Sequence, residues 1–127
     1  MVIWITGRQG AGKTTLAYAL KKRRKTAVVL DGDEIRAIYP ADYSNSGREK
    51  NIVRIGKLAG LLESQGFNVI VALVSPRQKW RDMARAYCKK SQLIYAMDGS
   101  LWPGTTYEDP DDFLEPHIKY RWTTKKS

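Results

Sequence analysis

Apolar residues gather in short continuous runs along this chain rather than in an alternating pattern. Four of these runs are rich in β-branched residues and end at polar or turn-forming positions, so they predict buried strands over residues 2–6, 26–31, 67–74 and 93–97. A weaker run predicts a last edge strand over residues 118–123. Strands that are apolar throughout are typical of a parallel sheet covered on both faces.

The segments between the predicted strands carry apolar residues at helical spacing instead. This spacing predicts helices over residues 14–24, about 47–65 and after Pro76, with a shorter helix over residues 33–38 that Pro40 ends. Strands that alternate with helices indicate an α/β fold, with a mainly parallel sheet of four or five strands and helices on both faces. At this length we expect residues 1–127 to form a single domain.

Charge and cysteine content narrow the classes of partner. The chain carries 22 Lys and Arg against 13 Asp and Glu, a formal charge of +9. This surplus favours anionic partners, whether nucleotide phosphates, a sulfated or phosphorylated small molecule, or nucleic acid. Cys88 and His117 are the only residues of their kinds, too few for an internal disulfide or a structural zinc site.

Neither a membrane segment nor a leader is visible in the sequence. The longest apolar run, residues 69–74, is far shorter than the about 20 residues that span a bilayer. Residues 1–7 carry no basic leader and already contain the first predicted strand. We therefore expect a cytoplasmic protein without a membrane partner.

A phosphate-binding motif follows the first predicted strand. Residues 7–14 fit G-x-x-x-x-G-K-[ST] at every fixed position and lie between a strand and a helix, the context that the motif requires. This predicts a three-layer P-loop NTPase fold that binds ATP and Mg²⁺, with Lys13 on the β- and γ-phosphates and Thr14 on the metal. The expected nucleotide-binding residues are Gly7, Gln9, Gly10, Ala11, Gly12, Lys13, Thr14 and Thr15. The short chain and the lack of an N-K-x-D motif favour a small kinase over a motor or a GTPase.

Two carboxylates follow the second predicted strand, at the sheet edge where ligands bind in this architecture. We expect Asp33 to accept a proton from an attacking hydroxyl or to hold the metal, and Asp31 to support it, so that Lys13, Asp33 and Asp31 form the catalytic set. The alternative for Asp33 is a cap on the short helix. Arg36, one turn later, could clamp an anionic acceptor.

Further polar residues follow on the next two helices. Arg48, Asn51 and Arg54 share one side of the long helix, either facing a substrate or forming a solvated surface. Ser75 ends the third strand, where it could bind phosphate or start a helix, and Arg81 lies one turn into that helix.

These motifs together resemble the adenylyl-sulfate kinase family, P-loop kinases that use MgATP to phosphorylate the ribose 3′-hydroxyl of adenosine 5′-phosphosulfate. The resemblance covers about the first 98 residues and rests on four groups of residues. They are residues 3–7 and 10–14, residues 30–33 and 36, residues 48, 51–52 and 54–56, and residues 75–76 and 81–82. It implies that Asp33 is the base or metal-linked carboxylate. It further implies that the acceptor nucleotide is contacted by Arg36, Arg48 and Asn51. Ser75 and Arg81 lie in the last matching segment, so we expect them on the same side of the site.

The chain departs from the family pattern at Lys50, Val53, Arg77 and Gln78, and residues 99–117 form a loop region in place of the family's charged lid. Trp102 could replace a residue that stacks on adenine.

Two interpretations of the function stay open. One is a small-molecule kinase acting on adenosine phosphosulfate or another hydroxyl, with a homodimer as one assembly. The other is a protein acting on or binding nucleic acid, although the basic run at residues 21–25 lies at the helix end remote from the phosphate loop.

Overall fold

A parallel five-stranded sheet with the order β2-β3-β1-β4-β5 forms the centre of the protein. The computed structural model describes residues 1–101 and 103–121. The strands are β1 (Val2–Gly7), β2 (Ala27–Asp31), β3 (Asn68–Ala72), β4 (Ser91–Ala96) and β5 (Ile118–Tyr120). All four pairings are parallel, with Val2 of β1 opposite Val69 of β3 on one side and Ser91 of β4 on the other. The predicted mainly parallel sheet is confirmed. Residues 122 and 123 of the expected edge strand lie outside the described residues, as does Trp102, the expected stacking residue.

Four helices join these strands: α1 (Lys13–Lys21), α2 (Gly32–Ile38), α3 (Asn45–Ser64) and α4 (Gln78–Arg85). Helix α3 begins two residues before the predicted start, because Ser44 Oγ accepts a 3.1 Å hydrogen bond from the backbone N–H of Gly47 and caps it. Helix α1 ends three residues before the predicted end. There the backbone tightens into bonds from Arg23 N to Leu20 O and from Arg24 N to Lys21 O.

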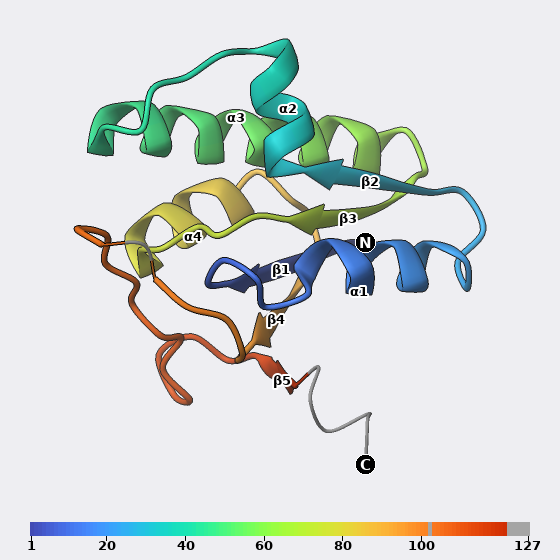
Figure 1. Cartoon of the computed structure of the whole chain (residues 1–127). Helices are drawn as coiled ribbons and strands as arrows, with labels where there is room; N and C mark the ends of the chain where they lie inside the picture. The colour runs from blue at the N-terminus through green and yellow to red at the C-terminus, as the bar shows by residue number, and fades with distance from the viewer. Residues whose placement is uncertain (102, 122–127) are drawn as a thin grey trace.

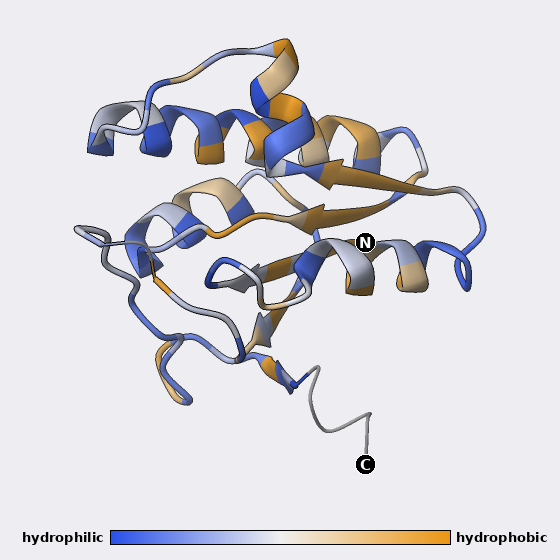
Figure 2. Cartoon of the chain, viewed as in Figure 1, coloured by the Kyte–Doolittle hydropathy of each residue, from blue (hydrophilic) through white to orange (hydrophobic). Residues whose placement is uncertain are grey.

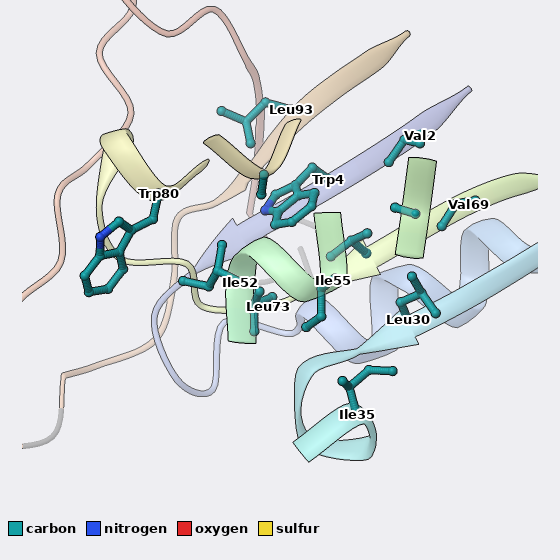
Figure 3. Packing of buried hydrophobic residues seen from close by; sticks show 13 residues of the cluster. Val2, Trp4, Leu30, Ile35, Ile52, Ile55, Val69, Leu73, Trp80 and Leu93 are labelled. Atoms are coloured by element: carbon teal, nitrogen blue, oxygen red, sulfur yellow. The ribbon is translucent and has the colours of Figure 1, made fainter. Parts of the chain in front are cut away.

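The helices cover both faces of the sheet, as Figure 1 shows. On one face, Leu16 and Ala17 of α1 pack with Ile3, Ile5 and Ile70. On the other, the larger cluster joins Val2 and Trp4 to residues of α3, α4 and α2, and Figure 3 shows Trp4 among the side chains of this cluster. Figure 2 shows the strands as the hydrophobic interior and the more hydrophilic positions on the helices and on the segment after β4. The fold therefore has three layers, as the sequence predicts.

Helices α3 and α4 approach closely because α3 presents glycines at their contact. A Cβ at Gly56 would lie 2.4 Å from the carbonyl oxygen of Ala84, and one at Gly60 would lie 2.2 Å from that of Tyr87. The backbones can pack at this distance only where both positions lack a side chain. This contact fixes α4 beside α3 and sets where the segment before α4 meets the sheet.

The segment between β4 and β5 contains no helix or named strand among its described residues. Backbone hydrogen bonds nevertheless tie it to the sheet end, since Ser100 N donates a 2.9 Å bond to Gln9 O and Glu108 N donates a 2.7 Å bond to Pro76 O. Figure 1 shows it as the orange trace beside the carboxyl ends of the strands. Within the described residues, no helix is both long and apolar enough to cross a bilayer.

Candidate active site

The phosphate-binding motif forms the turn between β1 and α1, in the context that the sequence predicts. Gly10 and Gly12 have φ angles of 73° and 85°, in the left-handed region that residues with a side chain rarely adopt. Helix α1 begins at Lys13, and no side chain caps its first turn. Its free N–H groups and the positive end of its dipole therefore face the loop, where they suit an anion.

Lys13 is held in this loop by a 2.7 Å hydrogen bond from its Nζ to the carbonyl oxygen of Arg8. Burial lowers the pKa of Lys13 to about 8, and the nearby carboxylates of Asp33 and Asp31 offset part of that shift. Because a phosphate group would favour the charged form, this lysine is suited to gain its full charge when an anion binds.

Asp31 connects the phosphate loop to the end of β2. Its Oδ2 accepts a 2.6 Å bond from Thr14 Oγ1, and its Oδ1 accepts bonds from the backbone N–H groups of Asp33 (2.9 Å) and Glu34 (3.4 Å). Asp31 is therefore the cap of α2, and the alternative interpretation of Asp33 as the cap is wrong. The Asp33 side chain is left exposed.

The oxygen atoms at this end of the site suit a magnesium ion. The hydroxyl of Thr14 and the carboxylates of Asp31 and Asp33 all face the same cavity. Mg²⁺ prefers oxygen ligands and usually takes one or two carboxylates together with phosphates of the substrate. Asp31 accepts a hydrogen bond from Thr14, which brings a second carboxylate beside the expected metal-binding pair of Thr14 and Asp33.

A cavity of about 410 Å³ joins the phosphate loop to the start of α3. Most of the predicted site residues line it: Gln9, Gly10, Ala11, Gly12, Lys13, Thr14, Thr15, Asp31, Asp33, Arg36, Arg48, Asn51 and Ser75. Gly7 lies at the buried end of β1 and is not among the lining residues, nor is Arg81. The sequence-predicted nucleotide side and acceptor side thus share one cavity.

The far wall of the cavity holds buried polar atoms that have no partner in the structure. Asn51 is only 1% exposed, yet neither its Oδ1 nor its Nδ2 makes a hydrogen bond, and Arg48 Nε is also buried without one. Leaving a buried polar group unpaired costs about 1–3 kcal/mol. A ligand in the cavity could pair these atoms, so this wall has the character of a binding surface rather than of packing.

Tyr43 is a site residue that the sequence reasoning missed. It lines the cavity, and its ring centroid lies 4.2 Å from the guanidinium carbon of Arg36 and 5.8 Å from that of Arg48. Its own ring is largely exposed. The residue falls in the segment 41–46, which the sequence predicts as a polar loop, and the available signal was that it is the one aromatic residue there.

Ser75 lines the cavity, but its hydroxyl is used inside the protein. Its Oγ accepts a 3.1 Å bond from Trp4 Nε1 and lies 2.9 Å from Thr6 Oγ1. Its backbone has a φ of 41°, unusual for a residue other than glycine, and α4 begins only at Gln78. Ser75 therefore does not start the helix, and its hydroxyl shapes the wall from within.

The predicted substrate contact of Arg81 is corrected by the structure. The side chain is completely buried and forms a two-pronged ion pair with Glu115, from Nε to Oε2 at 2.6 Å and from Nη2 to Oε1 at 2.7 Å. Its Nη1 donates to Ser75 O at 2.7 Å, and its Nη2 also donates to Glu108 O at 2.9 Å. With its three nitrogens engaged within the protein, Arg81 anchors the segment after β4.

Arg54, which the sequence allows to face a substrate, also lies away from the cavity lining, and so does Arg77. The guanidinium carbon of Arg54 lies 5.0 Å from the ring centroid of Tyr39, and that of Arg77 lies 5.2 Å from that of Trp80. Of the polar residues on α3, Arg48 and Asn51 therefore reach the site, whereas Arg54 turns outward.

The segment after β4 also fastens the phosphate loop. Arg8 Nη2 donates a 2.8 Å bond to Asp109 Oδ1 and Arg8 Nη1 a 3.0 Å bond to Tyr95 Oη. Tyr107 Oη lies 2.8 Å from Thr6 Oγ1, and burial raises the pKa of this phenol. The same segment lines the cavity with Ser100, Leu101, Thr105 and Thr106. These contacts join residues about 100 positions apart, which no local sequence signal reveals.

Comparisons with known proteins agree with this geometry. The family model described as adenylylsulphate kinase matches residues 1–98. An adenylyl-sulfate kinase of Paraburkholderia xenovorans (strain LB400) is 46% identical over 90 residues, which cover 66% of this chain and 50% of that protein. The chain thus spans about half the length of the curated relatives it matches.

Solved structures show the same relationship. The Mycobacterium tuberculosis APS kinase in complex with AMPPNP and APS superposes with a TM-score of 0.66 at 28% identity, over 75% of this chain and 61% of that one. A mutant of the same enzyme gives a TM-score of 0.75 at 26% identity, over 94% and 83% of the two chains. The matched segment contains the phosphate loop, both aspartates, Arg36 and the first half of α3. On this agreement of sequence, fold and site, the chain belongs to the adenylylsulphate kinase family.

Proposed function

We propose that this protein transfers the γ-phosphate of MgATP to the 3′-hydroxyl of adenosine 5′-phosphosulfate. The observation that carries the proposal is one cavity with a phosphate-binding loop on one wall and unpaired, buried Asn51 and Arg48 atoms on the other. A kinase needs both a triphosphate site and an acceptor site within reach of each other. Membership of the family supports the choice of this nucleotide acceptor.

On the triphosphate side, the loop N–H groups and the start of α1 would hold the phosphate oxygens. Lys13 would bind the terminal phosphates and become fully charged as it does so. A Mg²⁺ ion held by Thr14 and the adjacent carboxylates would neutralise charge on the phosphates. Asp31 is hydrogen-bonded to Thr14 and to the first turn of α2, so it would hold the starts of α1 and α2 in fixed positions beside the phosphates.

On the acceptor side, Asp33 is the carboxylate placed to accept the proton of the attacking hydroxyl. It is exposed on the cavity wall and close enough to Lys13 to offset part of the fall in the pKa of that lysine that burial causes. Arg36 and Arg48 would pair with the anionic phosphosulfate, and the Asn51 amide would bond to a polar edge of the nucleotide. The ring of Tyr43 is available to stack on a base. Because MgATP is abundant there, we also propose that the protein acts in the cytoplasm.

The test is a transfer assay with γ-labelled ATP and a panel of acceptors: adenosine phosphosulfate, nucleosides, sugars and hydroxymethylated DNA. We expect label on adenosine phosphosulfate, with the activity abolished by Lys13→Ala. A Lys22→Ala variant, which removes an exposed lysine after α1, serves as the matched control and should keep full activity. No transfer to any acceptor, or equal activity of Lys13→Ala and the parent, would contradict the proposal.

A further inference from the structure

The solvent-exposed face of α3 carries cations in a helical row. Lys50, Arg54 and Lys57 lie four and three positions apart, on the side of the helix opposite the buried Ile52 and Ile55. At 1.5 Å per residue, the row extends over about 10 Å. We call these three residues, together with Tyr39 and Tyr87 beside them, the α3 outer face.

A groove of about 390 Å³ runs between this row and α4, lined by Glu49, Lys50, Val53, Arg54, Lys57 and Met83. Three cations thus face a single carboxylate in the groove. None of the three takes part in an ion pair among the described residues. Outside the lining, Lys50 also acts on Asp42, whose pKa is lowered mainly by hydrogen bonds from Ser44 and to a smaller degree by Lys50 and Arg36. The groove therefore has a net positive charge.

Exposed aromatic rings flank the row on both sides. Tyr39 at the end of α2 is 55% exposed, and Tyr87 after α4 is 50% exposed. The Arg54 guanidinium carbon lies 5.0 Å from the centroid of the Tyr39 ring, and Lys57 Nζ lies 5.4 Å from that of the Tyr87 ring. Arg54 and Lys57 are thereby held in place, so less side-chain entropy is lost when they bind an anion.

We propose that the α3 outer face binds single-stranded nucleic acid. Its cations would contact successive phosphates, and the rings of Tyr39 and Tyr87 would stack on unpaired bases. Stacking on an aromatic ring beside a positively charged groove is how proteins bind single strands without reading sequence. A duplex keeps its bases stacked inside and would leave the tyrosines unused.

The α3 outer face adjoins the cavity through the segment between α2 and α3. Tyr39 begins that segment, and Tyr43 within it lines the cavity with Arg36 and Arg48. A strand bound on the outer face would therefore run past the acceptor wall. The binding proposal is independent of the kinase reaction, because none of its residues lines the cavity.

The experiment measures fluorescence anisotropy of a labelled 12-nucleotide single strand of mixed sequence, as DNA and as RNA, between 25 and 200 mM salt. Three phosphate contacts predict a slope of log affinity against log salt of about −2 for a single strand. Changing Lys50, Arg54 and Lys57 together to alanine should lower the affinity at least about tenfold and flatten the slope. Tyr39→Ala with Tyr87→Ala should lower it on the order of tenfold or more with the slope retained, while the two Tyr→Phe changes should preserve binding.

The control removes the same charges elsewhere. Lys22, Arg24 and Lys25, exposed residues after α1, are changed together to alanine and should alter the affinity by less than about twofold. Equal losses for the two triple variants would overturn the proposal, because net charge alone would explain binding. So would a lack of binding at 25 mM salt, equal affinity for a duplex of the same sequence, or full binding by the double Tyr→Ala variant. Circular dichroism and thermal unfolding confirm that each variant is folded.

Discussion

Thr14 Oγ1 donates a 2.6 Å hydrogen bond to Asp31 Oδ2, and this contact joins the first turn of α1 to the end of β2. The same carboxylate receives the backbone N–H groups of Asp33 and Glu34. One side chain therefore ties the first turn of α1 to the first turn of α2. Asp31 and Asp33, two residues apart, have different tasks as a result.

Exchanging each aspartate should separate these tasks. Asp31→Ala should lower the free energy of unfolding by about 1 kcal/mol, because α2 loses its cap, and it should also reduce activity. Asp33→Asn should leave stability unchanged but lower kcat by on the order of 10²–10⁴-fold, because it removes only the proposed base. Denaturant unfolding and steady-state kinetics measure the two effects. Equal loss of stability in both variants would contradict the assignment.

Asn51 should show a conflict between stability and binding. Its buried amide has no partner in the structure, so Asn51→Leu removes an unsatisfied group and should stabilise the fold by about 1 kcal/mol. The same change should raise KM for the acceptor more than tenfold while leaving KM for ATP unchanged. Thermal unfolding and kinetics with each substrate varied give the comparison. A destabilised Leu variant with normal acceptor KM would show that the amide serves the fold alone.

Lys13 should make stability depend on pH. Its pKa is lowered to about 8 in the folded protein, mainly by burial, from the usual lysine value of 10.5. Between these values the unfolded chain binds more protons, so this lysine makes the free energy of unfolding rise as the pH rises. Lys13→Met has no titrating group at this position, so its free energy of unfolding lacks this rise. The difference in the free energy of unfolding between Lys13→Met and the parent should therefore shift in favour of the parent between about pH 8 and pH 10. A difference that stays constant with pH would contradict the lowered pKa.

The buried pair of Arg81 and Glu115 should be essential as a pair. Glu115→Leu leaves Arg81 buried without its counter-charge, and Arg81→Met leaves Glu115 so; each should cost about 3–5 kcal/mol in the free energy of unfolding. The double change Arg81→Met with Glu115→Leu should cost less than either single change, because no buried charge is left alone. Chemical denaturation of the four proteins forms the cycle. Additive losses would mean that the two side chains act independently.

Much of the fold could be predicted because its signals are local. The apolar runs and helical periodicity placed all five strands and four helices to within a few residues. The phosphate loop needs neighbouring residues alone, since glycines at positions 10 and 12 permit the turn and Lys13 starts the helix. The largest helix-boundary errors arose at α3, where Ser44 caps the helix, and at α1, where tight turns end it, while β3 and β4 each missed one predicted boundary by two residues.

The lining of the cavity was predictable where the position of a residue along its helix fixes the direction of its side chain, as for Arg36, Arg48 and Asn51. It was not predictable where distant parts of the chain compete for the same side chain. Arg81 forms its ion pair with Glu115, 34 positions away, and the hydroxyl of Ser75 accepts its hydrogen bond from Trp4, 71 positions away. Tyr43 became part of the site only when its loop folded over two arginines.

The sequence by itself thus determined the layered α/β fold, the phosphate loop and the family, because each depends on contacts within a turn or two or on a matched run of residues. The tertiary structure alone decided which aspartate caps α2, which arginines face the cavity, and that the segment after β4 clamps Arg8 through Asp109. The physical reason is that a buried polar group must find a partner wherever the folded chain supplies one. That partner can stand anywhere in the sequence.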